Sequence, residues 1–238
     1  SMMMKMIAGG GGGGLTIEQP ENNIVRGAYY ALISALSGTQ TMALCSYDEA
    51  YTIPSEKAAL ISLRTMQILM EEMGLCDVAD PMGGSYYVEW LTNELEAKIV
   101  ETMKKVEGMG GIVKCISNGY IQSQVAKQAY EQEKRIQSGE LVKVGVNRYR
   151  IEEEDRAIEY HPYKHEEAEA QMQRLREVKE NRSDAEVKRR LEKLREKART
   201  DENLMQYIID AVREYATVGE ITAVLKDVFG VFKEPVRL

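Results

Sequence analysis

The sequence predicts an α/β protein that continues into a mainly helical region. Between Leu15 and Gly111, stretches with helical spacing of apolar residues alternate with short apolar segments, which is typical of parallel strands joined by helices. After Gly111 the spacing is mostly helical, and residues 164–200 are densely charged. The predicted divisions are a Gly-rich segment at 1–14, an α/β part at 15–110 and a mainly helical part at 111–238.

The first predicted helix covers residues 22–36, where apolar side chains recur at helical spacing before Gly38. Residues 39–44 are short enough and apolar enough for a buried strand. Ser55 is suited to cap a second helix, which runs to Met73 and ends at Gly74.

A further strand is predicted at 78–80, followed by the turn residues Gly83 and Gly84 and a third helix at 87–107. Such units form a parallel sheet covered by helices. Three of them cannot close a (β/α)₈ barrel, which takes about 250 residues. The pattern therefore predicts a partial unit whose sheet edge pairs with something else.

The second half is predicted to contain two helices within 112–139, a strand at 141–149 and helices over 164–200. Two capping boxes are expected, one formed by Ser183 with Glu186 and one by Thr217 with Glu220, the latter opening the last helix. Glu186 and Arg190 have the spacing of an ion pair on one helix face. The charged helices are interpreted as a solvated face or a subunit contact.

Composition excludes several classes of function. The net charge of −7 gives no electrostatic reason to expect binding to nucleic acid or to an anionic membrane. No apolar run approaches the roughly 20 residues needed to span a bilayer. The three cysteines, Cys45, Cys76 and Cys115, show no CxxC spacing, so neither a zinc site nor a disulfide is indicated. Reduced thiols predict a cytoplasmic protein.

Isolated motifs are weak in this sequence. The run Gly9–Gly14 formally contains GxGxxG, but no strand is predicted before it and Lys-Ser/Thr is absent, so a flexible linker is favoured over a phosphate loop. His161 and His165 are interpreted as surface residues, because Pro162 interrupts a helix between them and a third ligand is lacking. No histidine occurs in residues 1–150, which excludes histidine acid–base chemistry there.

Each of two acidic turns could be either a solvated turn or a functional loop. Cys45, Ser46, Tyr47, Asp48 and Glu49 follow the first predicted strand, and Asp80 ends the second, directly before Pro81 and the turn at 83–85. In βα architectures the loops after the strands carry functional side chains. Residue pattern alone does not decide between the two readings.

Longer motifs are far more specific. They read LTxxQPxNNIVR, GTQ, DEA, DPxGGSYYVE, EGMGGIVK, GVNRY, and TVGEI followed by VLKDVFG. With these motifs the chain from about Leu15 to Pro235 resembles the large subunit of the adenosylcobalamin-dependent acyl-CoA mutases, the methylmalonyl-CoA mutase family.

The resemblance implies a fold, a reaction and a site. Residues 15–107 would be the last three βα units of a partial (β/α)₈ TIM barrel, followed by a helical region. Such enzymes isomerise the carbon skeleton of an acyl-CoA by radical chemistry that adenosylcobalamin supplies. The implied cofactor-binding residues are Gly12, Glu49, Ala50 and Thr52, with Glu49 facing the cofactor. No catalytic residue is expected here, because the resemblance places the family's catalytic residues in the first five barrel units. No metal ligand is expected, because the cobalt ligand comes from another chain.

The resemblance also implies partners. They are a cobalamin-binding small subunit, an N-terminal mutase barrel half or a full-length mutase chain, and the acyl-CoA substrate. The 238 residues are expected to be inactive alone and to self-associate into an oligomer, because a missing barrel half leaves strand edges and apolar surface uncovered.

Two departures from the family bear on the substrate. Residues 41–45 read TMALC where methylmalonyl-type enzymes have SLHTN, so a histidine and an asparagine are lost. The segment MKMIAGG lacks the His/Gln side chains that hold substrate in the family. Other branched or hydroxylated acyl-CoAs are therefore open as substrates.

Three alternatives remain. The chain is a non-catalytic interaction or scaffold module derived from a mutase barrel, or these residues are one piece of a full-length mutase. A phosphate- or nucleotide-binding protein that uses the glycine run is the third and weakest alternative.

Overall fold

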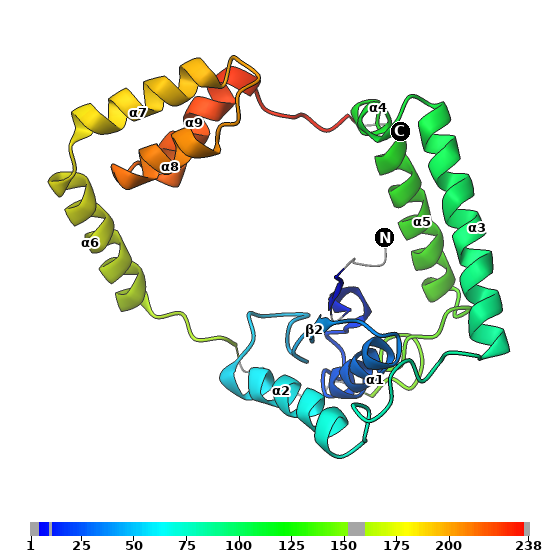
Figure 1. The fold of residues 1–238 in the computed structure, drawn as a ribbon. Coiled ribbons are helices and arrows are strands. Elements are labelled where there is room, and N and C mark those ends of the chain that lie inside the picture. Colours follow the sequence, from blue (N-terminus) through cyan, green and yellow to red (C-terminus); the bar gives the residue numbers. More distant parts are fainter. Residues whose placement is uncertain (1–4, 10, 152–159, 236–238) are drawn as a thin grey trace. The chain divides into compact units, whose positions relative to one another are not determined.

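The structure is a computed structural model that describes residues 5–9, 11–151 and 160–235. Contacts between residues divide the chain into two compact units. The first reaches to His161 and includes Pro235, and the second covers Pro162–Glu234. Each unit is described by itself (Figure 1).

The first unit combines a two-stranded parallel sheet with helices. Its elements are β1 (Ile7–Gly9), the 3₁₀ turn η1 (Gly12–Gly14), α1 (Asn22–Leu36), β2 (Thr41–Ala43), α2 (Glu56–Glu71), α3 (Tyr86–Gly108), α4 (Ile112–Ser117) and α5 (Tyr120–Gln137). β1 and β2 pair in the register Ile7 to Thr41, Ala8 to Met42 and Gly9 to Ala43. The described residues are thus mostly helical with a small parallel sheet, which agrees with the α/β class.

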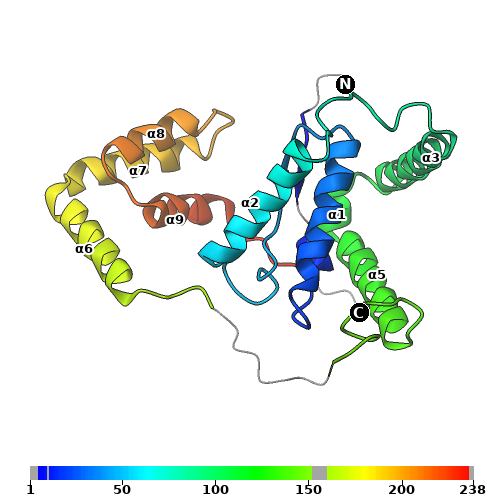
Figure 2. The same ribbon diagram turned by 90° about the horizontal axis from the view of Figure 1, so that it is seen from below.

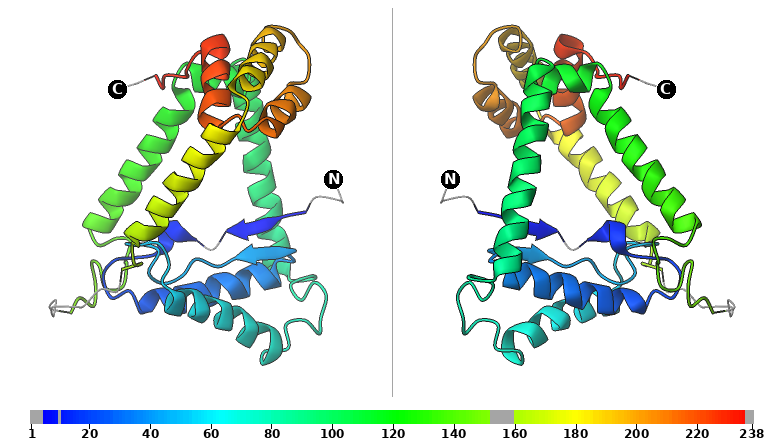
Figure 3. Two further views of the ribbon diagram at one scale, coloured as in Figure 1. Left: turned by 90° about the vertical axis from the view of Figure 1, so that its left-hand side faces the viewer. Right: turned by 90° about the vertical axis from the view of Figure 1, so that its right-hand side faces the viewer.

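Helix α1 lies along one face of this sheet (Figure 3), and its small residues allow close packing. Asn23, Gly27, Ala31 and Ser34 are its buried residues, and their spacing places them on one helix face. A Cβ built on Gly27 would lie 3.4 Å from Cδ1 of Leu44, the residue that follows β2. The absence of a side chain on Gly27 therefore lets α1 approach the end of β2.

Helix α2 packs beside α1 (Figure 2) and is tied to the same strand end. Its predicted cap is confirmed, because the Ser55 hydroxyl accepts from the Ala58 amide at 3.2 Å. Inside the helix, the hydroxyl of buried Ser62 donates to the carbonyl oxygen of Leu44 at 2.9 Å. Both helices thus converge on Leu44, directly before the loop that contains Glu49.

The strand predicted at 78–80 is wrong. Asp80 has a φ of 49°, which is left-handed rather than extended. Its carbonyl oxygen accepts from the Gly83 amide at 3.1 Å and so closes a turn. The sequence signal was misleading because Asp-Pro followed by Gly-Gly favours a turn more strongly than the two apolar residues Val78 and Ala79 favour a strand.

The strand predicted at 141–149 is also wrong. Only an isolated bridge between Val144 and Arg148 forms there. Asn147 folds the segment on itself: its Oδ1 accepts from the Lys143 amide at 2.8 Å, and its Nδ2 donates to the Ile136 carbonyl at 2.7 Å. A side chain that satisfies backbone groups locally competes with strand pairing.

The Gly-rich start was expected to be loop or linker, and that expectation is wrong for part of it. Ile7–Gly9 form β1, and Gly12–Gly14 form the 3₁₀ turn. Periodicity missed this strand because three residues, two of them Ala and Gly, carry almost no β propensity.

The helices from α3 onward follow the prediction, except that α8 (Met205–Arg213) was not predicted. In the first unit, α3 and the pair α4 and α5 correspond to the helices expected at 87–107 and within 112–139. The second unit contains α6 (His165–Asn181), α7 (Asp184–Lys197), α8 (Met205–Arg213) and α9 (Val218–Phe229). Helices α7, α8 and α9 enclose its core, which consists of Val187, Leu194, Ala211, Ala216, Ile221 and Val224.

One of the two predicted capping boxes in the second unit is confirmed, the other forms only in part, and the predicted ion pair does not form. Thr217 and Glu220 form the complete capping box that opens α9. At α7 the Ser183 hydroxyl accepts from the Glu186 amide, but the described structure lacks the reciprocal bond from the Ser183 amide to the Glu186 carboxylate. The Glu186 carboxylate pairs with Arg189 instead of Arg190, which lies 3.6 Å from Glu214 of the neighbouring helix segment. Tertiary packing thus overrides the local spacing rule at Arg190.

Candidate functional site

The glycine turn after β1 is shaped by one aromatic ring. Gly11 has a φ of 73°, and a Cβ on it would lie 2.7 Å from Cε2 of Tyr30. A Cβ on Gly14 would lie 3.1 Å from Cζ of the same ring. Tyr30 of α1 thus packs directly on the backbone of the turn, and side chains at these two glycines would displace it.

Gly12 meets two side chains from the loop after β2. A Cβ on Gly12 would lie 3.4 Å from Oε1 of Glu49 and 3.8 Å from Sγ of Cys45. Gly12 and Glu49 are exposed, and Cys45 is half-buried. The structure therefore brings together Gly12 and Glu49, the two implied cofactor residues that are far apart in sequence, at the carboxyl ends of the two parallel strands.

Asp48 organises the loop that presents Glu49. It is 1% exposed, and its Oδ2 accepts from the Ser55 amide at 2.9 Å. Its carbonyl oxygen accepts from the amides of Tyr51 and Thr52, at 3.0 and 3.1 Å. Its second carboxylate oxygen, Oδ1, is buried and accepts from no group in the described part of the chain. Of the two acidic residues, Asp48 thus acts as the scaffold and Glu49 is the exposed group.

The other two implied cofactor residues, Ala50 and Thr52, lie on the same turn as Glu49 but make their contacts with residues other than Gly12. Ala50 is half-buried within the turn. The Thr52 hydroxyl accepts from the His161 amide at 3.1 Å, and the His161 ring donates from Nδ1 to the Pro54 carbonyl at 3.1 Å. Tyr160 stacks edge-on against Tyr51, with ring centroids 6.4 Å apart. His161 is therefore a tether for this loop.

Buried residues of the motif LTxxQPxNNIVR hold the two segments of the site together through hydrogen bonds. Asn23 is 1% exposed, and its Nδ2 donates to the carbonyl oxygens of Thr16 and Tyr47, at 2.8 and 2.9 Å. Thr16 in turn donates its amide to Oδ1 of Asn23 at 3.1 Å. One buried side chain thus joins the segment after the glycine turn to the loop that bears Glu49.

Arginine and glutamine of the same motif reach the motif GVNRY. Arg26 donates to the Thr16 hydroxyl and to the Val144 carbonyl, both at 2.8 Å. Gln19 donates from Nε2 to the Tyr149 carbonyl at 3.1 Å. These residues are scaffold, because their polar groups bond to backbone and side chains of the same unit.

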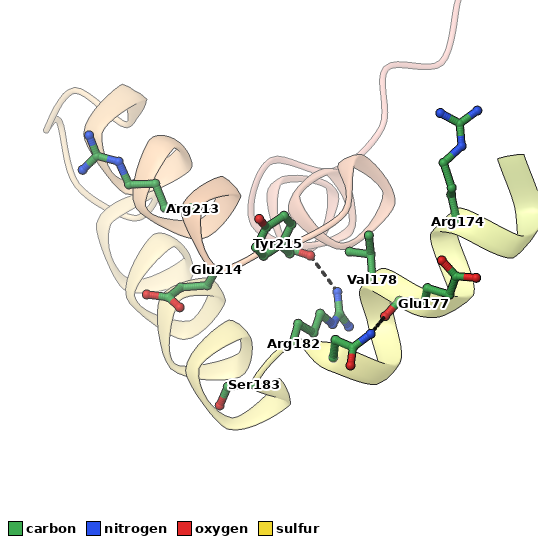
Figure 4. A pocket seen from close by; sticks show the side chains of 9 residues that line it. Arg174, Glu177, Val178, Arg182, Ser183, Arg213, Glu214 and Tyr215 are labelled. Carbon is green, nitrogen blue, oxygen red and sulfur yellow. Dashed lines mark hydrogen bonds between the residues drawn. The ribbon is translucent and has the colours of Figure 1, made fainter.

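A separate concavity lies in the second unit, between α6, α7 and the end of α8 (Figure 4). Its volume is about 510 Å³. Arg182 at its floor is saturated: it donates to both oxygens of Glu220, at 2.9 and 2.6 Å, and to the Tyr215 carbonyl at 2.9 Å. The pKa of Glu220 is lowered to about 2, chiefly by the hydrogen bond from Arg182. The lining is Arg174, Glu177, Val178, Asn181, Arg182, Ser183, Arg213, Glu214 and Tyr215.

The other features considered, which are metal clusters, membrane-spanning helices and His165, do not form a functional site in the described residues. Among the described residues, no cluster of three or more His, Cys, Asp or Glu side chains is placed to hold a metal ion. Among the same residues, no helix is long and apolar enough to cross a membrane. His165 pairs with Glu169 at 3.2 Å on the surface of α6, as a solvated helix residue. Tyr30 at the glycine turn was not predicted, and no pattern within the sequence marks it, whereas Cys45 belongs to the stretch after the first predicted strand that stayed open as a functional loop.

The family-level comparison decides the identity of the chain. A family profile described as methylmalonyl-CoA mutase matches residues 1–231. The chain belongs to the methylmalonyl-CoA mutase family. The resemblance drawn from the motifs is thereby confirmed, and the Gln19, Asn23 and Arg26 scaffold belongs to a motif that carried it.

Members of this mutase family with curated names match along most of the chain. The 2-hydroxyisobutanoyl-CoA mutase large subunit of Aquincola tertiaricarbonis is 45% identical over 221 residues, which are 92% of this chain and 39% of that protein. Methylmalonyl-CoA mutase of Cereibacter sphaeroides is 37% identical over 238 residues, covering 100% of this chain and 33% of the relative. The mitochondrial methylmalonyl-CoA mutase of Homo sapiens is 38% identical over 229 residues, covering 94% of this chain and 30% of the relative. The chain thus spans 30% to 39% of the length of these relatives.

Proposed function

We propose that this chain is part of an adenosylcobalamin-dependent acyl-CoA mutase, an isomerase, and that it contributes the cofactor-facing wall of a (β/α)₈ barrel. The observation that carries the proposal is the meeting of Gly12 and Glu49 at the carboxyl ends of β1 and β2. In barrels of parallel strands, active sites lie at this end. Within the proposal, residues 15–110 belong to the barrel part.

The residues present fit the cofactor. Gly12 is exposed and bears no side chain, so a flat macrocycle can approach its backbone closely. The Glu49 carboxylate beside it is exposed and accepts hydrogen bonds from hydroxyl or amide groups. When bound, adenosylcobalamin supplies the radical chemistry of the isomerisation.

In this proposal the residues of this chain position the cofactor and shield it from solvent. The backbone of Gly12, which bears no side chain, sets how closely the cofactor approaches the chain. Glu49 fixes the orientation of the cofactor through hydrogen bonds. The small side chain of Ala50 leaves space for the cofactor above the turn. Thr52 stabilises the turn through its hydrogen bond with His161. No proton transfer is assigned to these side chains.

In this proposal, mutase activity requires residues and subunits that this chain does not supply. The 238 residues act with an N-terminal mutase barrel half or a full-length mutase chain, and with a small subunit that brings cobalamin and the cobalt ligand. The name of one relative, a large subunit, supports a second subunit. Uncovered apolar side chains such as Ile7, 74% exposed on β1, support both pairing with further barrel strands and oligomer formation. Free thiols at all three cysteines are consistent with the cytoplasm.

The proposed substrate is a branched or hydroxylated acyl-CoA. The relative named for 2-hydroxyisobutanoyl-CoA is more similar, at 45% identity, than the methylmalonyl-CoA mutases at 37% and 38%. Gly9 and Ala43 are paired at the ends of β1 and β2, and both are exposed. Such small residues leave room for a branched acyl group beside the cofactor wall.

A second candidate is a non-catalytic scaffold module. Its support is α3, which has no buried residue and exposes aromatic side chains: Tyr86 is 93%, Tyr87 67% and Trp90 56% exposed. An exposed aromatic patch of this kind marks an interaction surface.

Isomerisation of an acyl-CoA panel separates the two candidates. The chain is tested alone, and then with a cobalamin-binding subunit and the remaining barrel sequence, using adenosylcobalamin and 2-hydroxyisobutanoyl-, methylmalonyl- or isobutanoyl-CoA. Rearrangement only in the completed mixture is expected. Rearrangement by the chain alone contradicts the requirement for partners, and none in a mixture that assembles fully favours the scaffold.

A further inference from the structure

Cys45 lies at a point that the proposed function does not use. It is the second residue after β2, and its Sγ would lie 3.8 Å from a Cβ on Gly12. The Glu49 carboxylate would lie 3.4 Å from the same point. Thiol and carboxylate therefore line the same side of the exposed glycine, in a cluster built from three separate positions of the chain.

The chemistry of the thiol follows from its surroundings. Burial, and then the neighbouring Glu49 carboxylate, raise the pKa of the Cys45 thiol. A hydrogen bond from the Gly12 backbone acts in the opposite direction. With the pKa raised, the thiol keeps its proton at neutral pH, so it is a hydrogen-bond donor rather than a nucleophile.

We propose that Cys45 is a positioning residue whose S–H group holds the Glu49 carboxylate over Gly12. This inference rests on the proposed function, in which Glu49 orients the cofactor. Glu49 is exposed, and an exposed glutamate samples many rotamers that binding would have to freeze. A donor already beside the carboxylate reduces that cost by ordering Glu49 before the cofactor arrives.

The contact is tested without any cofactor by alkylation of the thiols. Iodoacetamide reacts with the thiolate, so its rate against pH at each cysteine, followed by mass spectrometry, reports the pKa. In the complete chain, Glu49→Gln is expected to move the Cys45 profile to lower pH by roughly one unit. Cys76 is exposed and serves as the internal control, with an unchanged profile. Identical Cys45 profiles in the two proteins would overturn the proposal.

The positioning role is tested by cofactor affinity in the reconstituted mutase. Cys45→Val removes the donor at similar size and is expected to weaken adenosylcobalamin binding about threefold to tenfold. Cys45→Ser retains a donor and is expected to stay close to the parent protein. The double variant with Glu49→Gln should bind no more weakly than Glu49→Gln alone, because Cys45 acts through Glu49. Additive losses, or equal losses in the Ser and Val variants, contradict the role.

The two levels of proposal fail in different ways. If Glu49→Gln leaves cofactor affinity unchanged, the cofactor site itself is wrong, and the positioning role of Cys45 fails with it. If Glu49→Gln weakens binding while the Cys45 alkylation profile does not move, the cofactor site stands and only the Cys45 proposal is overturned.

Discussion

The side-chain amide of Gln19 donates a hydrogen bond to the carbonyl oxygen of Tyr149, 130 residues later in the chain, at 3.1 Å. Gly145 approaches the same side chain, since a Cβ there would lie 3.2 Å from Cδ of Gln19. Arg26 adds a second link to this segment through the Val144 carbonyl. Two motifs that are distant in sequence are thus joined by side chains of one motif and backbone of the other.

Substitution of Arg26 tests the link between the motifs. Arg26→Lys cannot reproduce the planar fork that reaches Thr16, Asn23 and Val144 together. The free energy of unfolding is expected to fall by about 1–3 kcal/mol. Urea denaturation measures the loss. Arg150→Lys, at an exposed arginine close to the same segment, is the control and should change stability by less than about 0.5 kcal/mol.

Substitutions in the glycine turn test its packing against Tyr30. Gly14→Ala places a methyl group into the Tyr30 ring and is expected to cost about 1–3 kcal/mol. A Cβ on Gly13 has no heavy atom within 4 Å, so Gly13→Ala should be nearly neutral. Thermal unfolding compares the two proteins. Equal stability of both variants would mean that Tyr30 does not cover the turn.

The Arg182–Glu220 pair predicts a pH dependence for the second unit. The pKa of Glu220 is lowered to about 2, so the folded state favours its ionised form. The contribution to stability is therefore fully present above about pH 4.5 and is lost as the pH falls toward 2. Because the Glu220 side chain is 32% exposed, we expect a contribution on the order of 2 kcal/mol after solvent screening.

Glu220→Gln is the matched variant for this pH dependence. Unfolding free energies measured between pH 5 and 2.5 should fall more steeply for the parent protein than for the variant. Parallel slopes would show that another carboxylate carries the acid sensitivity.

Helices and caps of this chain were predictable because their signals are local. Ser55 and Thr217 were recognised from the capping pattern, and both side chains cap helices in the structure. The strand expected at 78–80 failed for the opposite reason. Strand formation depends on a partner strand, whereas the turn at Asp80 closes through its own neighbours.

The candidate site shows the same division. The family motifs pointed to Gly12 and Glu49, which the structure brings close together. Residue pattern placed Cys45 directly after a predicted strand but did not reveal its closeness to Gly12, because that closeness depends on the parallel pairing of β1 with β2. Nor did it reveal that Asp48 is buried and holds the loop while its neighbour Glu49 is exposed.

The affinity of the reconstituted mutase for adenosylcobalamin tests the central proposal most directly. Glu49→Gln removes the charged acceptor beside Gly12 and is expected to weaken binding roughly tenfold. Glu131→Gln on α5, also exposed, makes the same chemical change elsewhere and should leave affinity unchanged. A tenfold loss confined to Glu49→Gln would support the cofactor-facing wall. Equal affinity of the parent protein and both variants would contradict it.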